Sequence, residues 1–450
     1  MAKEVNAIYT ANVKIAFDYI KKEGQTPKRF SILSERIDYI MIDYKYENQN
    51  ILPVIVISLK MNPSLYDKLL STYDTSKIYF KLTKKDTQSG TSVATTVVND
   101  EFSYVVSNHE QNNARELNSE GTNSDSYIST TIGLISTTMT EILRESFNGV
   151  YHNTNVESLL FATALKGIPK KKLIMTPIKY NKNIDSLLIK PLNNRYKMIE
   201  AIFDEEAFYD TNFTFFFDFD GKTYLVDKSG EPVSKDGLPD KIYFHITKKI
   251  DSSSMVPGST IKNNSYHIYV NAVNSVMNIN DSIEQIADTI VSFDHKHDKV
   301  QELSITGKKK SSTSNKNIYL KSDNAAVFKN EMNNSTVTLE LFKQNLDASI
   351  ITPNRGFYVT FENEYSKYNG KYILSYKQEI YVQTQGKEFT QTCKVGLKRV
   401  NAIERANSDK DTAVSVRHDI YNTKATKTSS ADLKAISKNT SVTANNRTKS

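Results

Sequence analysis

Hydrophobic and polar residues alternate with a period of two over much of the first hundred residues. The alternation is clearest in 78–86 (IYFKLTKKD) and 101–110 (EFSYVVSNHE), and 51–61 (ILPVIVISLKM) is rich in β-branched residues. Such side chains pack well on a pleated, half-buried surface, and a period of two places them on one face of a strand. The pattern therefore predicts a strand-rich segment over 29–110, with a polar turn at 87–96.

The same pattern returns in the last part of the chain. Residues 241–250 (KIYFHITKKI), 263–274 (NNSYHIYVNAVN) and 336–400 have the alternation and turn signals of strands. The end of this region predicts two long strands that are joined near Gln385-Gly386. A second strand-rich segment is therefore expected over 239–401.

The middle of the chain, 111–238, mixes the two kinds of pattern. Three helices are predicted, near 138–147, 155–166 and 194–207. A capping-box pattern begins at Thr138 and again at Thr154, each followed three residues later by Glu. A strand between the last two helices is expected to end at Pro191, and a further short helix is expected around 281–290.

The segment 213–227 predicts an aromatic hairpin. Four phenylalanines alternate along its first strand, namely Phe213, Phe215, Phe217 and Phe219. Asp220-Gly221 is a type I′ turn signal, because glycine adopts a positive φ without Cβ strain. The return strand is expected over 222–227.

Four segments lack a clear strand pattern. The N-terminal 1–28 is amphipathic and charged, and 111–129 is a polar stretch that we expect on the surface. Residues 308–317 are rich in Lys, Ser and Asn, and 402–450 are polar and of low complexity. A chain of such composition buries too little apolar surface to fold by itself, so the C-terminal tail is expected to need neighbours for order.

Composition and charge narrow the function classes. Only 15 of 450 residues are glycine, which argues against glycine-rich nucleotide-binding loops, and the single cysteine excludes an internal disulfide. The net charge of +7 is spread along the chain, with short runs at Lys170–Lys172 and Lys308–Lys310. These runs read as solvated loops, with DNA passing nearby as the alternative. The sequence has no signal-peptide pattern and no apolar stretch of membrane-spanning length, so synthesis in the host cytoplasm is expected.

Three groups of residues are candidates for catalysis or metal binding. Cys393 shares one face of the final strand with Phe389 and other apolar residues, and lacks a nucleophile motif, so we expect it in the core. His295 and His297, between Asp294 and Asp298, form a weak candidate metal site, with a solvated turn or strand end as the alternative.

Carboxylates form the third group. Asp204, Glu205 and Glu206 lie on the last predicted helix, where adjacent side chains point about 100° apart and cannot form a facing pair. Asp218 and Asp220 lie at the hairpin end, where a turn role explains them more simply. The sequence therefore predicts no catalytic residues, no cofactor and no enzyme.

At the aromatic hairpin the chain resembles a known family. A helix followed by FTFFFDFDGKTYLV is similar to the middle of phage baseplate hub proteins, whose fold is shared by the type VI secretion spike. The C-terminal unit also resembles the last β-barrel segment of these proteins. The matching residues are Gly356, Gly370, Tyr372, Gly386, Phe389, Thr390, Leu397 and Arg399. The resemblance covers roughly 30–400, and departs from the family at Gln378-Glu379, where the family often has a histidine.

The resemblance implies a fold and a function. The fold would be mainly β with a smaller α+β part: two tube-forming antiparallel β-barrel domains at 29–110 and 239–401, and an inserted peripheral mixed α/β domain at 111–238. The function would be that of a homotrimeric central hub that joins the hexameric tail tube to the threefold central spike, in the virion tail baseplate. The implied partners are tail tube protein, the spike or a tail-associated lysozyme, and baseplate wedge proteins, with transient DNA contact through a lumen.

Other functions stay open at this point. Tube-terminating, distal-tail and wedge proteins use the same barrel, so the sequence pattern separates them poorly from a hub. A cell-wall glycan hydrolase would need a paired-carboxylate or His/Cys site in a cleft. A secreted adhesin would need a signal peptide, which the sequence does not show.

Overall fold

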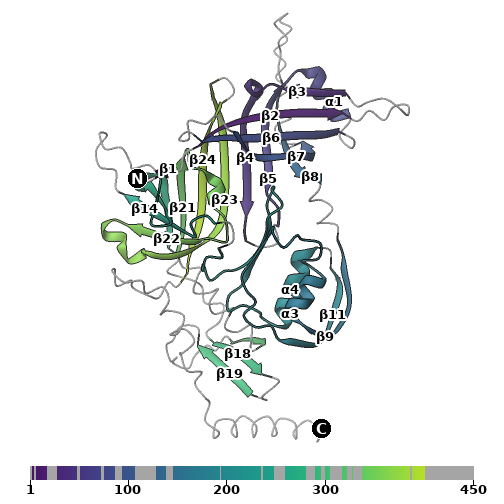
Figure 1. Cartoon of the computed structure of the whole chain (residues 1–450), viewed down its shortest axis with the longest axis vertical. Helices are drawn as coiled ribbons and strands as arrows, with labels where there is room; N and C mark the ends of the chain where they lie inside the picture. The colour runs from purple at the N-terminus through teal and green to yellow at the C-terminus, as the bar shows by residue number, and fades with distance from the viewer. Residues whose placement is uncertain are drawn as a thin grey trace, which may run out of the picture. The chain divides into compact units, whose positions relative to one another are not determined.

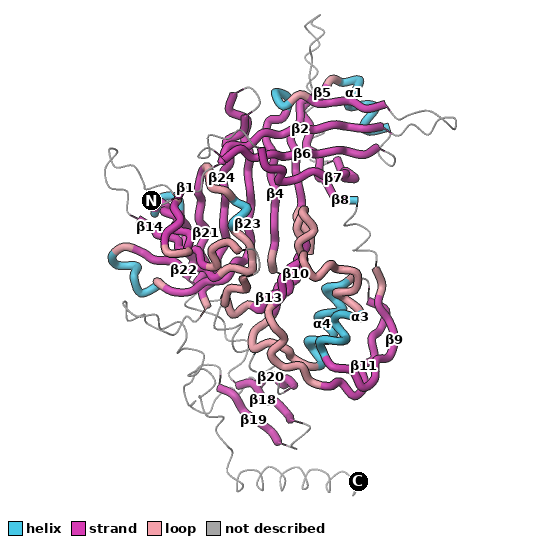
Figure 2. Tube along the Cα trace, viewed as in Figure 1, coloured by secondary structure: helices cyan, strands magenta, loops and turns pink. Residues whose placement is uncertain are grey.

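The protein is described by a computed structural model. It describes residues 3–4, 7–17, 28–47, 51–71, 76–86, 94–106, 128–137, 145–192, 194–234, 237–247, 259–279, 289–294, 299–304, 317–321, 327, 337–385 and 388–400. Two compact units are present, the first formed by 1–279 with 333–406 and the second by 280–332 with 407–450. The described part is mainly β with a smaller α+β part, as predicted (Figures 1 and 2).

The strands of the first unit fall into an N-terminal, a middle and a C-terminal group. The N-terminal group is Lys3–Glu4 (β1), Ala7–Phe17 (β2), Lys28–Ile32 (β3), Ile37–Lys45 (β4), Val54–Met61 (β5), Ser76–Asp86 (β6), Ala94–Val106 (β7) and Ile128–Ser136 (β8). The middle group is Phe147–Asn155 (β9), Leu173–Met175 (β10), Asn183–Leu192 (β11), Phe213–Phe217 (β12) and Thr223–Asp227 (β13). The C-terminal group is Lys241–Thr247 (β14), Thr260–Lys262 (β15), Ser265–Asn271 (β16), Ser275–Ile279 (β17), Val337–Gln344 (β21), Gly356–Phe361 (β22), Gly370–Gln385 (β23) and Glu388–Arg399 (β24).

Helices are short and few in the described residues. The α-helices are Pro63–Ser71 (α1), Val156–Ala162 (α3) and Arg195–Glu205 (α4), and the 3-10 turns are Ser34–Arg36 (η1), Ala272–Asn274 (η2), Ala348–Ile350 (η3) and Asn363–Tyr368 (η4). Asn155 and Asn194 cap α3 and α4, each accepting a hydrogen bond from a backbone N–H three residues on. The predicted cap Thr154 lies one residue too early, because Asn155 has the extended conformation and the oxygen that the cap requires.

Eight strands close into an antiparallel ring. Going round, the order is β23, β4, β5, β8, β7, β6, β2 and β24, and β24 then pairs with β23. Inward-facing side chains such as Ile40, Ile57 and Phe80 are fully buried within it. Closure removes the free strand edges, which are otherwise sites of unwanted pairing.

A second sheet shares strands with the ring. β23 also pairs with β22, and β24 also pairs with β21. Beyond β22 the sheet continues through β14, β16 and β15, and beyond β21 it continues through β17. β14 runs parallel to both β16 and β22, so this sheet is mixed, where the sequence analysis expected antiparallel pairing. Its inner face and the ring interior form one continuous hydrophobic core.

The aromatic hairpin is present, and its two strands are buried except at Asp227. Phe219, expected on the first strand, lies in the turn, because β12 ends at Phe217. β12 pairs with β13, and β13 pairs in parallel with β10. Phe213 packs on Phe203 of α4, while Phe216 of the opposite face packs on Tyr46 beyond β4, at ring distances of 5.3 and 4.8 Å. The hairpin therefore joins the helical part to the closed ring (Figure 2, β13).

The hairpin turn differs from the predicted type I′ turn. Gly221 N donates to Asp218 O, and Asp218 N donates to Lys222 O, so five residues separate the paired strands. Among the described residues of this turn only Gly221 has a positive φ, at 76°. A type I′ turn needs positive φ at both central residues, and the observed form is a type I turn followed by a left-handed glycine.

Other predicted elements also differ. Phe147, expected on a helix at 138–147, is the first residue of β9, and 138–144 lie outside the described residues. Pro191 does not end its strand, because β11 continues through a bulge to Leu192, which pairs with Phe147. Proline is compatible with such a place because its missing N–H removes no regular ladder bond there.

The second unit is described only in part. Strands Thr289–Asp294 (β18), Lys299–Ser304 (β19) and Asn317–Lys321 (β20) form a three-stranded sheet with β18 in the centre. The helix expected around 281–290 is wrong at its end, since Ile290 pairs with Leu303 in this sheet. Residues 281–288, most of the loop at 308–317, and the tail at 402–450 lie outside the described residues.

Candidate functional site

A fully buried ion pair lies on the inner face of the ring. Lys377, Glu379 and Tyr381 alternate along β23, so all three side chains point the same way, and each is at most 2% exposed. Lys377 Nζ lies 2.9 Å from one oxygen of Glu379, and the Tyr381 hydroxyl donates to the other. Every charged atom of the pair thus has a partner, which is the condition for burying charge at tolerable cost.

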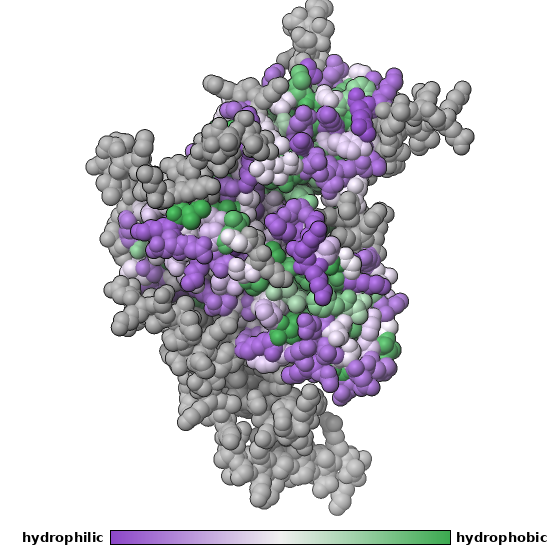
Figure 3. Space-filling view, in the orientation of Figure 1, coloured by the Kyte–Doolittle hydropathy of each residue, from purple (hydrophilic) through white to green (hydrophobic). Residues whose placement is uncertain are grey.

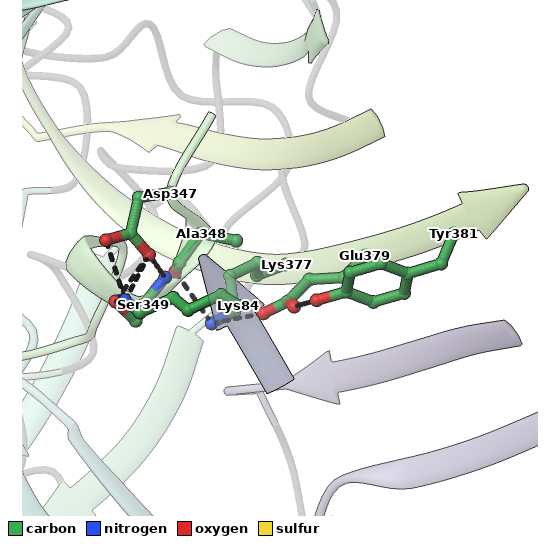
Figure 4. Close-up of polar contacts among 7 residues, drawn as sticks. All are labelled: Lys84, Asp347, Ala348, Ser349, Lys377, Glu379 and Tyr381. Atoms are coloured by element: carbon green, nitrogen blue, oxygen red, sulfur yellow. Dashed lines mark hydrogen bonds and ion pairs between the residues drawn. The ribbon is translucent and has the colours of Figure 1, made fainter. Parts of the chain in front are cut away.

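Residues from other elements complete this cluster (Figure 4). Lys377 Nζ also donates to Ala348 O at 3.1 Å, and lies 4.0 Å from the centre of the Tyr44 ring. A second pair, Lys84 with Asp347 at 2.7 Å, lies at the same end of η3, where Asp347 is the N-terminal cap and Ser349 also accepts from Lys84. The two pairs therefore fix η3 against both the ring and the shared strand β23.

Asp218 at the hairpin turn interacts electrostatically with the Lys377 ammonium. Burial raises the pKa of this half-buried carboxyl to about 6, although the Lys377 ammonium lowers it and Asp220 raises it. Burial by itself would lower the pKa of Lys377, but Glu379 and Asp218 outweigh it, so the pKa of Lys377 is raised. Lys377 consequently stays charged while Asp218 titrates close to neutrality.

Cys393 lies beside Glu379 across the β23–β24 ladder, and is fully buried and free, as predicted. Burial, reinforced by the Glu379 charge, raises the pKa of this thiol well above its ordinary value. A thiol in this state is a weak nucleophile, because the reactive form is the thiolate.

The predicted carboxylates serve other contacts. Glu206 is the C-terminal cap of α4 and pairs with Lys182 at 3.0 Å. Asp220 Oδ1 accepts from Lys222 N at 2.8 Å within the hairpin turn. The structure therefore places Glu206 and Asp220 in ordinary capping and turn roles.

The candidate metal residues His295 and His297 lie outside the described residues. Within the described part of the chain, no group of three or more metal-ligating side chains is found. The metal site at 294–298 therefore stays a prediction.

An aromatic ladder covers the solvent side of the second sheet. It is formed by half-buried residues of three neighbouring strands, namely Tyr243, His245, His267, Tyr269 and Tyr358, with Thr360 at the end beside His245. His245 lies between His267, 2.9 Å away through Nε2, and the Thr360 hydroxyl, 2.8 Å away through Nδ1. Burial lowers the pKa of both imidazoles, so at neutral pH they are uncharged and can share one hydrogen bond.

The visible described surface is mostly hydrophilic, with small hydrophobic patches between (Figure 3). Exposed apolar side chains include Val273, Leu188 and Val150, and the last two face each other across the β9–β11 ribbon. Among the described residues, no helix is long and apolar enough to span a membrane.

A family model now bears on this geometry. The model described as Bacteriophage PBS1 gene 109 protein matches residues 6–400, which is most of the chain. The chain belongs to this family. Among curated proteins, none matches the chain.

Solved structures with a similar arrangement are tail proteins and a secretion-system component. A tail protein from Neisseria meningitidis MC58 is 11% identical, with a TM-score of 0.47 and coverage of 88% of this chain and 99% of that one. The 43 kDa tail protein of prophage MuSo2 from Shewanella oneidensis is 8% identical, with a TM-score of 0.48 and coverage of 88% and 100%. The E. coli c3393 protein, a component of the type VI secretion system, is 6% identical, with a TM-score of 0.37 and coverage of 83% and 76%.

Membership of the gene 109 family confirms the resemblance to phage proteins that the sequence shows. In the sequence, Gln378-Glu379 stands out only as a departure from the family pattern, and the buried pair of Glu379 with Lys377 is not predicted. A signal was present: charged residues at 377 and 379 alternate with the strand period inside a hydrophobic run. Alternation alone, however, does not say which face is inside.

Proposed function

We propose that this gene 109 family protein is the central hub of a phage tail baseplate. Three copies would form a closed trimer that joins the sixfold tail tube to the threefold spike. The alternative tube-terminating, distal-tail and wedge roles use the same kind of barrel and differ in copy number.

The observation that carries the proposal is the sharing of β23 and β24. These strands, 16 and 12 residues long, belong both to the closed ring and to the second sheet. Two β-modules built on continuous strands move as one body, because bending between them would break the ladder. Each subunit therefore offers two β-modules in a fixed relation, and three subunits would offer the six that a hexameric tube requires.

The buried pairs support the same interpretation. Lys377–Glu379 and Lys84–Asp347 both hold η3 at the junction of ring and second sheet. These contacts favour one relative placement, since any other would separate Lys84 from Asp347 and Lys377 from Ala348 O. Three subunits can close into a trimer only if the angle between the two β-modules is fixed.

The proposed protein is a virion component that acts by binding its neighbours rather than by catalysis. Its partners would be the tail tube protein, the central spike or a tail-associated lysozyme, and baseplate wedge proteins. The domain boundaries at 29–110, 111–238 and 239–401 remain part of the proposal. The ring itself draws strands from 7–136 and from 370–399.

Copy number tests the proposal. Light scattering on the purified full chain should give three times the chain mass of 51.1 kDa. Cryo-electron microscopy of tails should then find three copies at the junction of tube and spike. Six copies per tail would replace the hub by a tube-terminating or distal-tail role. A stable monomer that never binds tail tube protein would contradict both the hub role and the alternative tail roles.

A further inference from the structure

A notch interrupts the wall of the ring at β2. The two residues Tyr9 and Thr10 pair with β24, whereas Val13 to Phe17 pair with β3. Between them, Ala11 and Asn12 have no strand partner on that side among the described residues, and the Ser34 hydroxyl donates to Ala11 O. The change of neighbours opens a groove of about 670 Å³, with the segment 31–34 on one side and Glu388 on the other.

Three lysines converge on this groove. Lys14 of β2 and Lys81 and Lys85 of β6 line it and are exposed. Strand alternation separates them from Lys84, which points to the other face and pairs with Asp347. Within the described residues, no ion pair joins the three groove lysines to a carboxylate, and Glu388 is the only acidic residue of the lining.

The rest of the lining consists of small polar groups. Asn12 lies directly across the ladder from Lys81, and Thr10 lies across from Thr83. Ser31 and Ser34 add hydroxyls from the other wall. Lysine, serine, threonine and asparagine are the side chains that contact phosphate oxygens in complexes with nucleic acid. No aromatic side chain lines the groove, so bases would have nothing to stack on.

We infer that this groove binds the backbone of a phosphodiester polymer, without reading its bases. The ammonium groups supply charge, and the hydroxyl and amide groups supply short polar contacts to the phosphate oxygens. The polymer is either nucleic acid or a polyol-phosphate chain, since both present the same repeating phosphodiester. The inference goes beyond the hub role and does not depend on it.

Fluorescence anisotropy tests the inference on the full chain. The probe is a short labelled DNA duplex in two unrelated sequences, and poly(glycerol phosphate) is the competitor that represents the other source. Both duplexes should bind equally, with a slope of log affinity against log salt of about −2 to −3 for three phosphate contacts. Replacing Lys14, Lys81 and Lys85 together by Gln should weaken binding about tenfold or more and flatten the slope.

A matched variant separates the groove from overall charge. Lys166, Lys170 and Lys171 are exposed and lie outside the groove, so their joint replacement by Gln removes the same charge elsewhere. Thermal unfolding of both triple variants should match the wild type, because all six side chains are on the surface. Equal weakening in the two variants would overturn the inference. So would poly-glutamate competing as well as poly(glycerol phosphate) at equal charge, and so would failure of both phosphodiester polymers to bind.

Discussion

At the scale of single residues, the protein places charge where a barrel normally places hydrocarbon. Lys377 and Glu379 are each 2% exposed. Tyr381 of the same strand donates to Glu379, while Ala348 of η3 and the Tyr44 ring of β4 contact Lys377. A buried pair of this kind adds little net stability, because desolvation offsets the attraction. Its physical effect is on specificity, because Lys377 keeps its hydrogen bond to Ala348 O only while η3 lies beside β23.

Asp218 gives this cluster a pH dependence. Its folded pKa of about 6 lies above the unfolded value of about 4, so the folded state binds the proton more tightly. Its contribution to stability is complete below pH 4 and is lost as the pH rises through 6. Asp218→Asn should therefore remove this loss and raise the free energy of unfolding at pH 7 by about 1 kcal/mol, a reduced figure because the side chain is half-buried.

Urea unfolding of wild type and variant at pH 5 and pH 7 measures the effect. Asp185→Asn is the control, because it removes an exposed carboxylate of β11 that is not among the groups acting on Asp218. A wild type and an Asp218→Asn variant with the same pH dependence would show that Asp218 does not titrate in this range.

At the scale of elements, one glycine shapes the shared strand pair. Gly396 of β24 pairs with Tyr376 of β23 beside a bulge, and a Cβ at Gly396 would lie 2.1 Å from the Tyr376 ring. The Tyr376 hydroxyl is held by Glu340 of β21, which also pairs with Lys394 at 2.9 Å. The ring therefore cannot simply turn away, and it covers the glycine.

Gly396→Ala should accordingly lower the free energy of unfolding by about 1–3 kcal/mol, the usual cost of overpacking. In a Tyr376→Ala background the same change should cost much less, because the clashing ring is gone. Chemical denaturation of the four proteins of this cycle measures the coupling. An additive cycle would mean that the Tyr376 ring does not limit position 396.

At the scale of the whole molecule, the ring is closed by β2 and β24, the two of its strands that lie furthest apart in the sequence. β2 pairs with β6 over eleven residues, but meets β24 through only Tyr9 and Thr10. The N-terminal segment, read from the sequence as a separate amphipathic stretch, supplies this closing strand. Its alternating residues Val13 and Ile15 are fully buried.

Removal of residues 1–17 should open the ring and expose the edges of β6 and β24. The shortened chain should lose cooperative thermal unfolding. It should also aggregate, because free strand edges pair with other chains. Removal of 402–450 is the control, since the described strands end before it. A shortened chain with wild-type cooperativity would show that β2 is not needed for closure.

Local patterns determined most of the elements. The period of two predicts β5, β6, β14, β16 and the long β23–β24 hairpin, and the alternating phenylalanines predict β12. Cys393 is correctly expected in the core because its neighbours on one face are apolar. These inferences succeed because the pleat of a strand is a local property, and every second side chain must face the same way.

Tertiary structure decided what local patterns leave open. Closure of the ring depends on β2 and β24, which are almost the whole chain apart, and the parallel pairing of β14 with β16 and β22 has no local signature. The groove lysines are scattered in the sequence, and only the pairing of β2 with β6 brings Lys14, Lys81 and Lys85 to one place. Likewise, Lys377 and Glu379 could have faced water, and became a buried pair because β23 is shared by two sheets. Hydrophobic pattern fixes the faces of a strand, whereas the choice of neighbours fixes which face is inside.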